Sequence, residues 1–171
     1  MPAECRNFRD PIEPILYLDA TYAIATLDET EAYHSDCANF YERLESESVL
    51  SVVSDLVYNE LAFHRIKAAM TIEGIRTNQH WLDVKRNRPN FIATIMPDVE
   101  SKKAELNCMV LKLSIGDAVT ERAFQLMRNY SLLPTDAYHI AIALDAGVNC
   151  FVTLDRDFWR VDGIIVYTCL P

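Results

Sequence analysis

Short apolar runs alternating with amphipathic segments are the feature that most limits the fold of this sequence. Runs of strand character lie at residues 14–18, 49–53, 150–153 and 164–167, and residues 110–113 form a weaker candidate. Between them, apolar residues recur at spacings of three and four, which is typical of amphipathic helices. Alternation of buried strands with helices predicts a parallel sheet covered on both faces, so we expect an α/β fold.

The helical segments connect these runs in order along the chain. We expect helices at residues 20–25, 31–46, 56–70, 71–90 with a break near Pro89, 99–109, 117–129 and 134–145, and a turn or short helix at 155–159. A chain of 171 residues corresponds to about one domain. With no repeat or linker in view, we expect residues 1–171 to form a single domain, with residues 65–110 as a helical elaboration.

The net charge and the lack of long apolar runs limit the kinds of partner that this protein can bind. The formal net charge is −9, and a field of that sign repels polyanions at long range. It does not exclude a nuclease, since carboxylates that hold divalent cations add negative formal charge. Residues 1–10 have no signal-peptide core, and no apolar run approaches the ~20 residues needed to cross a bilayer. We expect a cytoplasmic protein with no membrane partner. Five scattered cysteines indicate neither a zinc cage nor a disulfide framework.

Three aspartates occupy positions where ligands bind in parallel sheets, outside the carboxyl ends of the strands. Asp19 ends the first run, Asp155 follows the run 150–153, and Asp136 lies in the first turn of the helix opened by Pro134. Each has a structural alternative, because Asp at such a junction often only caps a helix or occupies its first turn.

Glu60 is a fourth candidate because it falls on the apolar side of its helix. At roughly 100° per residue, it lies within the apolar arc that runs from Leu56 through Val57 to Leu61. Asp55 and Asn59 lie on the opposite side of the helix. A buried carboxylate is costly unless something pairs with it. The alternatives to a functional acid are a salt bridge or a side chain whose tip reaches water.

Four acids could therefore meet at one edge of the sheet. Such a cluster cannot stay fully ionised without cations, and hard oxygen ligands select Mg²⁺ or Mn²⁺. Two such ions can activate a water and stabilise the leaving oxygen of a phosphodiester. The sequence holds no P-loop or G-x-G-x-x-G motif that would compete with this interpretation.

The segments that carry these acids resemble the PIN domain family, and within it the VapC-type toxins. The similar segments are Leu18-Asp19-Ala20-Thr21, Leu56-Val57-Tyr58-Asn59-Glu60-Leu61, Pro134-Thr135-Asp136-Ala137-Tyr138-His139-Ile140-Ala141-Ile142-Ala143 and Val152-Thr153-Leu154-Asp155-Arg156-Asp157-Phe158. Their order and spacing agree with the family along nearly the whole chain. The last segment matches its Thr-x-Asp-x-Asp-Phe pattern.

The resemblance implies a three-layer α/β/α fold with about five parallel strands and a metal-dependent ribonuclease. The family's catalytic and metal-ligating acids carry over to Asp19, Glu60, Asp136 and Asp155. It also implies an RNA substrate and a cognate antitoxin protein, and we expect a homodimer. Two features depart from the pattern: residues 65–97 are longer than a compact member needs, and the acidic balance is unusual for a protein that holds RNA.

Three further residues have possible accessory roles. Thr21 could orient Asp19 or hold a water on the metal, or its hydroxyl could bond only the helix backbone. Asp157 could support the site from outside, or cap a turn. His139 shares a helix face with Asp136. We interpret it as a packed or hydrogen-bonded histidine rather than a proton shuttle.

The one local basic cluster is Lys85, Arg86 and Arg88, with Trp81 and Phe91 nearby. Cations interleaved with aromatics suit phosphate contact and base stacking, so this cluster is a candidate RNA contact. A solvated helix end is the alternative.

The sequence as a whole predicts a PIN-like endoribonuclease using Mg²⁺ or Mn²⁺, and most simply the toxin of a toxin–antitoxin pair. A catalytically silent PIN-like binding or scaffold module is the first alternative. A phosphatase, suggested by Asp155-Arg156-Asp157, is the second.

Overall fold

A six-stranded parallel sheet forms the centre of the computed structural model, which describes residues 2–171. The strands are β1 (Glu4–Asn7), β2 (Ile15–Leu18), β3 (Leu50–Val53), β4 (Leu111–Lys112), β5 (Cys150–Val152) and β6 (Ile165–Thr168), in the spatial order β1-β6-β5-β2-β3-β4. Every neighbouring pair is parallel. The predicted α/β fold with a parallel sheet is confirmed.

The strand that sequence patterning did not predict is β1. It pairs only with β6 and forms one edge of the sheet, where the Glu4 amide donates to the Ile164 carbonyl at 2.9 Å. Most of its side chains are exposed. An edge strand with solvent-exposed side chains needs no apolar run, so hydrophobic patterning cannot detect it.

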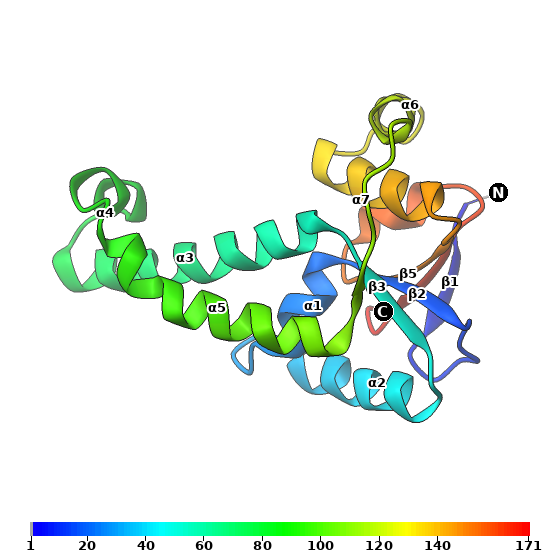
Figure 1. The fold of residues 1–171 in the computed structure, drawn as a ribbon, viewed down its shortest axis with the longest axis horizontal. Helices are drawn as coiled ribbons and strands as arrows, with labels where there is room; N and C mark the ends of the chain where they lie inside the picture. The colour runs from blue at the N-terminus through cyan, green and yellow to red at the C-terminus, as the bar shows by residue number, and fades with distance from the viewer. Residues whose placement is uncertain (1) are drawn as a thin grey trace.

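Helices cover both faces of the sheet, which gives three layers (Figure 1). One layer holds α1 (Ala20–Leu27) and α2 (His34–Ser46), and the other holds α6 (Val119–Tyr130) and α7 (Pro134–Asp145). The helices within each layer pack against each other. Among the described residues 2–171, no helix combines the length and the apolar character that crossing a membrane requires.

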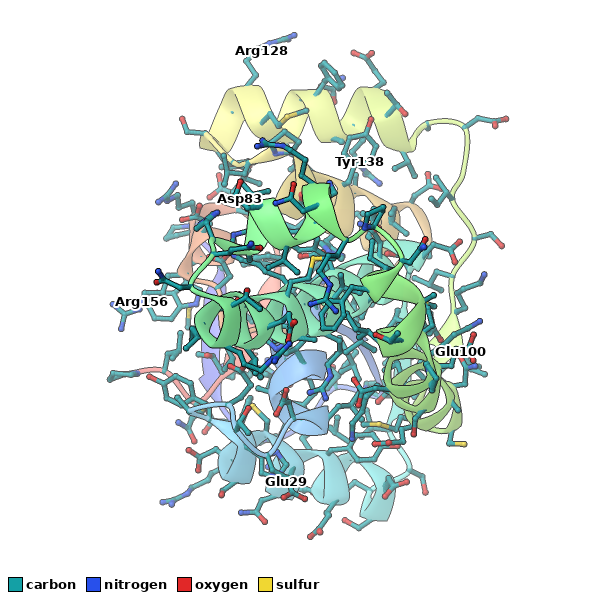
Figure 2. The ribbon with its side chains drawn as sticks, turned by 90° about the vertical axis from the view of Figure 1, so that its left-hand side faces the viewer. Glu29, Asp83, Glu100, Arg128, Tyr138 and Arg156 are labelled. Carbon is teal, nitrogen blue, oxygen red and sulfur yellow. The ribbon has the colours of Figure 1, made fainter. Side chains whose placement is uncertain are left out.

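A helical hairpin projects from the sheet between these two layers. It consists of α3 (Asp55–Thr77), α4 (Trp81–Asn87) and α5 (Phe91–Met109). We call its residues 62–99 the arm. Figure 2 looks onto the end of the arm, where Asp83 on α4 is labelled. At 1.5 Å per residue the 23 residues of α3 extend about 34 Å.

The arm has a hydrophobic cluster of its own, formed by Met70, Val84, Ile95 and Val99. The helices of the arm begin and end at other residues than predicted from the sequence. The turn after α3 comes at Asn78, in the left-handed conformation with φ 54°, and α5 begins at Phe91 and continues through Pro97. This apolar cluster explains why most of the polar stretch 71–90 is helical, because the helices of the arm bury apolar side chains against one another.

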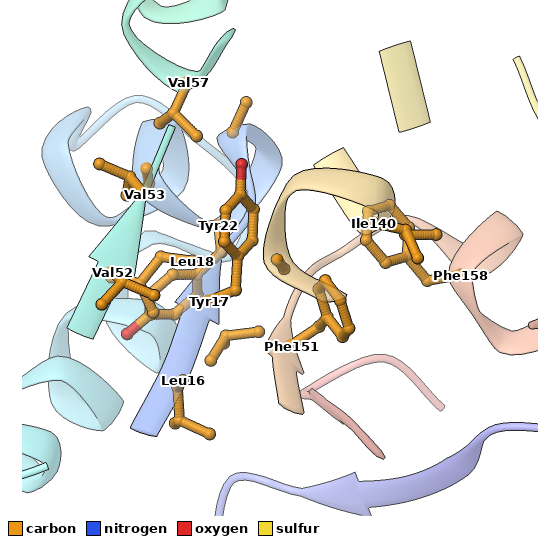
Figure 3. Packing of buried hydrophobic residues seen from close by; sticks show 14 of the residues in the cluster. Leu16, Tyr17, Leu18, Tyr22, Val52, Val53, Val57, Ile140, Phe151 and Phe158 are labelled. Carbon is orange, nitrogen blue, oxygen red and sulfur yellow. The ribbon is translucent and has the colours of Figure 1, made fainter. Parts of the chain in front are cut away.

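The two central strands, β2 and β5, are packed in the main hydrophobic core and end at the same edge of the sheet. Tyr17 and Leu18 of β2 lie opposite Phe151 and Val152 of β5, and all four are fully buried. Ile140 of α7 packs on the same cluster (Figure 3). Since both central strands end at the same edge, the residues that follow them are brought together there.

Candidate active site

Asp19 follows β2 directly and is the N-cap of α1. Its side chain is almost fully buried, with 3 % of the residue exposed. One carboxylate oxygen, Oδ2, accepts hydrogen bonds from the hydroxyls of Thr21 at 2.6 Å and Thr153 at 2.9 Å. The predicted capping role is therefore confirmed, and Thr21 also bonds Asp19 directly. The second oxygen, Oδ1, remains the one that can meet a ligand.

Thr153 joins the two central strands at this edge. Its buried hydroxyl donates to Asp19 and accepts from the backbone amide of Asp155 at 2.9 Å. The Thr21 hydroxyl accepts in the same way from the Leu154 amide at 3.0 Å. The loop after β5 is thus held against the start of α1. Sequence reasoning included Thr153 in the Thr-x-Asp-x-Asp-Phe pattern but assigned it no role. A hydroxyl at the last position before the loop was the available signal.

Asp155 caps the short 3₁₀ helix η1 (Arg156–Arg160) by accepting from the Asp157 amide at 2.8 Å. The capping alternative is therefore confirmed for Asp155 as well. Burial, followed by the charges of Asp157 and Asp19, raises the pKa of Asp155. Asp157 itself forms an ion pair with Arg160 at 2.7 Å. Asp155 consequently faces other carboxylates, whereas Asp157 already has a cation.

Asp136 lies in the first turn of α7, which Pro134 opens. Its pKa is raised to about 6 by burial and then by the charges of Asp155 and Asp19. Like charges act on a carboxylate in this way only when they are near it. The structure therefore brings Asp136, Asp155 and Asp19 to one edge of the sheet from three separate elements.

Glu60 reaches this edge from α3 and is held by His139. The His139 Nε2 atom lies 2.5 Å from Glu60 Oε1 and 3.8 Å from Asp19 Oδ1. His139 is 1 % exposed, whereas the Glu60 side chain is 33 % exposed. Glu60 thus both pairs with a partner and reaches water. The prediction of a packed, hydrogen-bonded histidine is confirmed.

A buried hydrogen-bond chain continues behind His139. Its Nδ1 atom lies 2.7 Å from the Tyr17 hydroxyl, which lies 2.7 Å from the Ser54 hydroxyl. Burial of the imidazole lowers the pKa of His139, but the hydrogen bond to Glu60 and the charges of Asp19 and Glu60 outweigh it and raise the pKa. Sequence reasoning missed Tyr17 and Ser54, because their contacts cross between strands and helices.

The spacing of the four acids is looser than that of a closed metal cage. Within residues 2–171, no three of Asp19, Glu60, Asp136 and Asp155 bring carboxylate oxygens within 4.8 Å of one another. A Mg²⁺ ion with ligands at about 2.1 Å needs oxygens no more than about 4.2 Å apart. Small side-chain rotations would therefore accompany binding. The donor chemistry fits, since all four groups offer hard oxygens and their mutual repulsion favours a cation.

Another group of ionisable side chains lies at the far end of α1. Asp28, Glu31 and His64 have ligand atoms within 4.8 Å of one another. However, Arg65 donates to the same Asp28 oxygen at 2.5 Å and bonds Asp98 at 2.8 Å. This group is an ion-pair network that ties the end of α1 to α3 and α5.

The basic residues of the predicted RNA contact lie at the end of the arm. Arg88 pairs with Glu73, a largely buried acid on α3, and lies over the Phe91 ring. Arg86 is 77 % exposed and 3.4 Å from Asp83, and Lys85 is exposed. Glu73 is 13 residues beyond Glu60 on the same helix, or about 20 Å. The cluster is thus remote from the four acids, and Arg88 already has a structural partner.

Comparison with known proteins identifies the family. The sequence profile described as PIN domain matches residues 16–164, which include all four acids. The chain belongs to the PIN domain family. Ribonuclease VapC2 of Methanocaldococcus jannaschii is 24 % identical over 121 residues, which cover 71 % of this chain and 74 % of that protein.

Solved structures with this PIN fold share little sequence with the chain. VapBC2 from Rickettsia felis, bound to a promoter DNA fragment, matches with a TM-score of 0.58 and 14 % identity over 90 % of this chain and 98 % of that one. DNA-bound VapBC from Salmonella typhimurium matches with a TM-score of 0.54 and 15 % identity, over 92 % of this chain and 100 % of that one. The sarcin–ricin loop cleaving toxin VapC20 of Mycobacterium tuberculosis matches with a TM-score of 0.51 and 16 % identity, over 84 % of this chain and 92 % of that one. At these identities the likeness establishes the fold.

Proposed function

We propose that this PIN-domain protein is an endoribonuclease that depends on Mg²⁺ or Mn²⁺, and that Asp19, Glu60, Asp136 and Asp155 form its active site. The observation that carries the proposal is the gathering of buried and half-buried carboxylates at one sheet edge. His139 lies 2.5 Å from Glu60 and 3.8 Å from Asp19, and Thr153 joins Asp19 to the backbone amide of Asp155. The charges of Asp155 and Asp19 also raise the pKa of Asp136. The name of the archaeal relative, a ribonuclease, supports the reaction class. We also propose that residues 1–171 act as one PIN-like domain that the arm elaborates.

Three of the four acids are oriented by other groups of the chain. Thr21 and Thr153 fix one oxygen of Asp19, the cap of η1 fixes one oxygen of Asp155, and His139 fixes one oxygen of Glu60. Each carboxylate therefore keeps a second oxygen for a cation. When bound, a divalent cation supplies Lewis-acid stabilisation of the phosphate and lowers the pKa of a water that attacks phosphorus.

Asp136 is the group among them whose charge is least stable without a cation. With a pKa of about 6 it holds a proton for part of the time near neutral pH in the metal-free protein. If these carboxylates held a divalent cation, its charge would compensate those of Asp155 and Asp19, and the pKa of Asp136 would fall. Cleavage should therefore require Asp136 in its ionised form.

The partners that we propose follow from the relatives. RNA is the substrate. The solved VapBC structures from Rickettsia felis and Salmonella typhimurium support a cognate antitoxin as protein partner. A homodimer is the oligomeric state that we propose. A toxin that acts on RNA works in the cytoplasm, which is the location we propose.

Cleavage of a labelled RNA by purified protein, with increasing Mn²⁺ and with EDTA, tests the proposal. We expect cleavage that requires Mn²⁺ and that Asp136→Asn reduces by at least 10³-fold, on the order expected when an essential charged group is lost. Asp145→Asn is the matched control, because Asp145 is exposed at the other end of α7. Equal loss in both variants, or full activity of Asp136→Asn, would contradict the proposal. RNA binding without cleavage by the wild type would favour a silent binding module.

A further inference from the structure

His139 occupies a position in the site that neither capping nor core packing requires. It is a polar side chain with 1 % exposure, set among the apolar residues Ala137, Ile140 and Ala141 of α7. Both of its ring nitrogens have partners, at 2.5 Å and 2.7 Å. A buried imidazole with two short contacts is strongly oriented, because any rotation would leave a buried polar atom unpaired.

The direction of the hydrogen bonds follows from the chemistry of the groups. An ionised Glu60 can only accept, so His139 Nε2 carries the proton that it donates. A phenol is protonated near neutral pH, so the Tyr17 hydroxyl is able to donate to Nδ1 of the neutral His139 ring. The Ser54 hydroxyl can then donate to the Tyr17 oxygen. The chain Ser54–Tyr17–His139–Glu60 is therefore consistent along its whole length.

Glu60 is the member of the site that most needs such an anchor. Its side chain has three rotatable bonds and is 33 % exposed, whereas the Asp19 side chain is 5 % exposed and is held by two hydroxyls. A partly exposed glutamate without a partner would turn toward solvent. The bond from His139 restrains Oε1, and the same His139 nitrogen lies 3.8 Å from Asp19 Oδ1, so Glu60 is held on the side of the site where Asp19 lies.

We infer that His139 is a positioning residue that holds Glu60 in the orientation needed to bind the divalent cation, and that Tyr17 and Ser54 hold His139. The inference rests on the proposed function, because it concerns the same carboxylates. His139 does not itself bind the cation, since the nitrogen that faces the site is the one that donates to Glu60.

Two amide substitutions separate the two contacts of the ring. The Gln side chain places its terminal amide near the position of Nε2, so His139→Gln keeps a donor for Glu60. The Asn side chain reaches only the position of Nδ1, so His139→Asn keeps the contact to Tyr17 and loses Glu60. We expect His139→Asn to weaken Mn²⁺ binding about 10-fold to 100-fold, which is typical for residues that orient metal ligands. His139→Gln should weaken it less than about 3-fold.

Calorimetric titration with MnCl₂ alone is the measurement, with thermal melting to monitor folding. In a Glu60→Gln background, His139→Asn should add no further loss of affinity, because the two residues act as a unit. If either histidine variant fails to fold, Tyr17→Phe tests the same chain, with an expected loss of about 3-fold to 10-fold. Tyr22→Phe is its matched control. Tyr22 is equally buried, and its hydroxyl bonds the Cys37 carbonyl.

The outcomes distinguish the inference from the proposed function. Normal Mn²⁺ affinity in His139→Asn, additive losses in the Glu60→Gln background, or equal effects of Tyr17→Phe and Tyr22→Phe would overturn the positioning role alone. A wild-type protein that binds no Mn²⁺ would overturn the proposed function and this inference with it. Loss of affinity in His139→Asn, recovery in His139→Gln and no effect of Tyr22→Phe would establish it.

Discussion

The hydroxyl of Thr153, at the end of β5, donates a 2.9 Å hydrogen bond to the carboxylate of Asp19, at the end of β2. These residues are 134 positions apart and meet because the two central strands end at the same edge of the sheet. The bond engages Oδ2 of Asp19 within the protein and leaves Oδ1 without a hydroxyl partner among residues 2–171. It also links the carboxylate to the loop that carries Asp155, through the Asp155 amide.

Replacing Thr153 with Val should weaken Mn²⁺ binding about 10-fold to 100-fold while preserving the fold. Val matches the shape of Thr but cannot donate to Asp19 or accept from the Asp155 amide, so both acids lose a fixed orientation. Calorimetric titration with Mn²⁺ measures the effect. Thr26→Val is the control, because the Thr26 hydroxyl donates to the Tyr22 carbonyl within α1. Equal Mn²⁺ affinity in the two variants would argue against an orienting role for Thr153.

Asp136→Asn should stabilise the metal-free protein at pH 7 by about 1 kcal/mol. The pKa of Asp136 is raised to about 6 in the folded state, above its value of about 4 in the unfolded chain. The folded protein therefore binds more protons between these values, and its stability falls as pH rises from about 4 to about 6. The Asn variant lacks this fall. Partial solvation of Asp136 reduces the size of the effect.

Urea unfolding at pH 4 and pH 7, with EDTA and with Mn²⁺, tests this prediction. With EDTA the variant should exceed the wild type at pH 7 and match it at pH 4. With Mn²⁺ the order should reverse at pH 7, because a ligand at 100 times its dissociation constant stabilises the folded wild type by about 2.7 kcal/mol. A variant less stable than the wild type in EDTA at pH 7 would contradict the clustering of charge at Asp136.

The fold, and the placement of Asp19 and Asp155 at one edge of the sheet, could be predicted from sequence because both depend on local signals. A buried parallel strand is a continuous apolar run, and an acid directly after it must lie at the ligand-binding edge. Asp19 and Asp155 are of this kind, and each is also a helix cap. Capping does not exclude the proposed metal-binding role, since it uses only one carboxylate oxygen.

The partners of those acids could not be predicted, because they depend on contacts between distant segments. Tyr17 meets His139 across 122 positions, and Thr153 meets Asp19 across 134. In the sequence Tyr17 has the character of a strand core residue, His139 that of a packed helix residue, and Thr153 is marked only by its place in the Thr-x-Asp-x-Asp-Phe pattern. None of these local signals names the residue on the distant segment that each one contacts. Strand β1 was not predicted for another reason: most of its side chains are exposed, so its sequence has no apolar run.

Asp28 should stabilise the protein in a pH-dependent manner. Burial opposes its ionisation, but hydrogen bonds from Thr30 and the charge of Arg65 outweigh burial and lower the pKa of Asp28 to about 2. A lowered pKa in the folded state gives stability that is present above about pH 4 and is lost as pH falls toward 2. Asp28→Asn should therefore cost about 2 kcal/mol at pH 7 and almost nothing at pH 2.

Thermal or urea unfolding from pH 2 to pH 7 measures the Asp28 contribution. Asp98→Asn is the control, because Asp98 shares Arg65 but its side chain is 47 % exposed. An exposed ion pair contributes between about 0.2 and 1 kcal/mol, so this variant should show a smaller loss. Parallel stability curves for Asp28→Asn and the wild type across this pH range would be inconsistent with the lowered pKa.

The end of the arm should contact RNA through Lys85 and Arg86. Their side chains are exposed, whereas Arg88 is held by Glu73, so only the first two are free to bind phosphates without a cost to the arm. If each contacts one phosphate, the logarithm of RNA affinity should fall with the logarithm of salt concentration, with a slope of about −0.7 per contact. Lys85→Ala with Arg86→Ala should then flatten the slope by about 1.4.

Fluorescence anisotropy with a single-stranded RNA and catalytically inactive protein, over a range of KCl concentrations, tests the contact. Lys102→Ala with Lys103→Ala is the matched control, because it removes the same charge from α5. Arg88→Ala should instead lower thermal stability, since it leaves the largely buried Glu73 with only Arg76. If the double variant at Lys85 and Arg86 keeps the wild-type slope, the end of the arm is not an RNA contact. Its exposed cations would then be available to a protein partner, such as an acidic segment of an antitoxin.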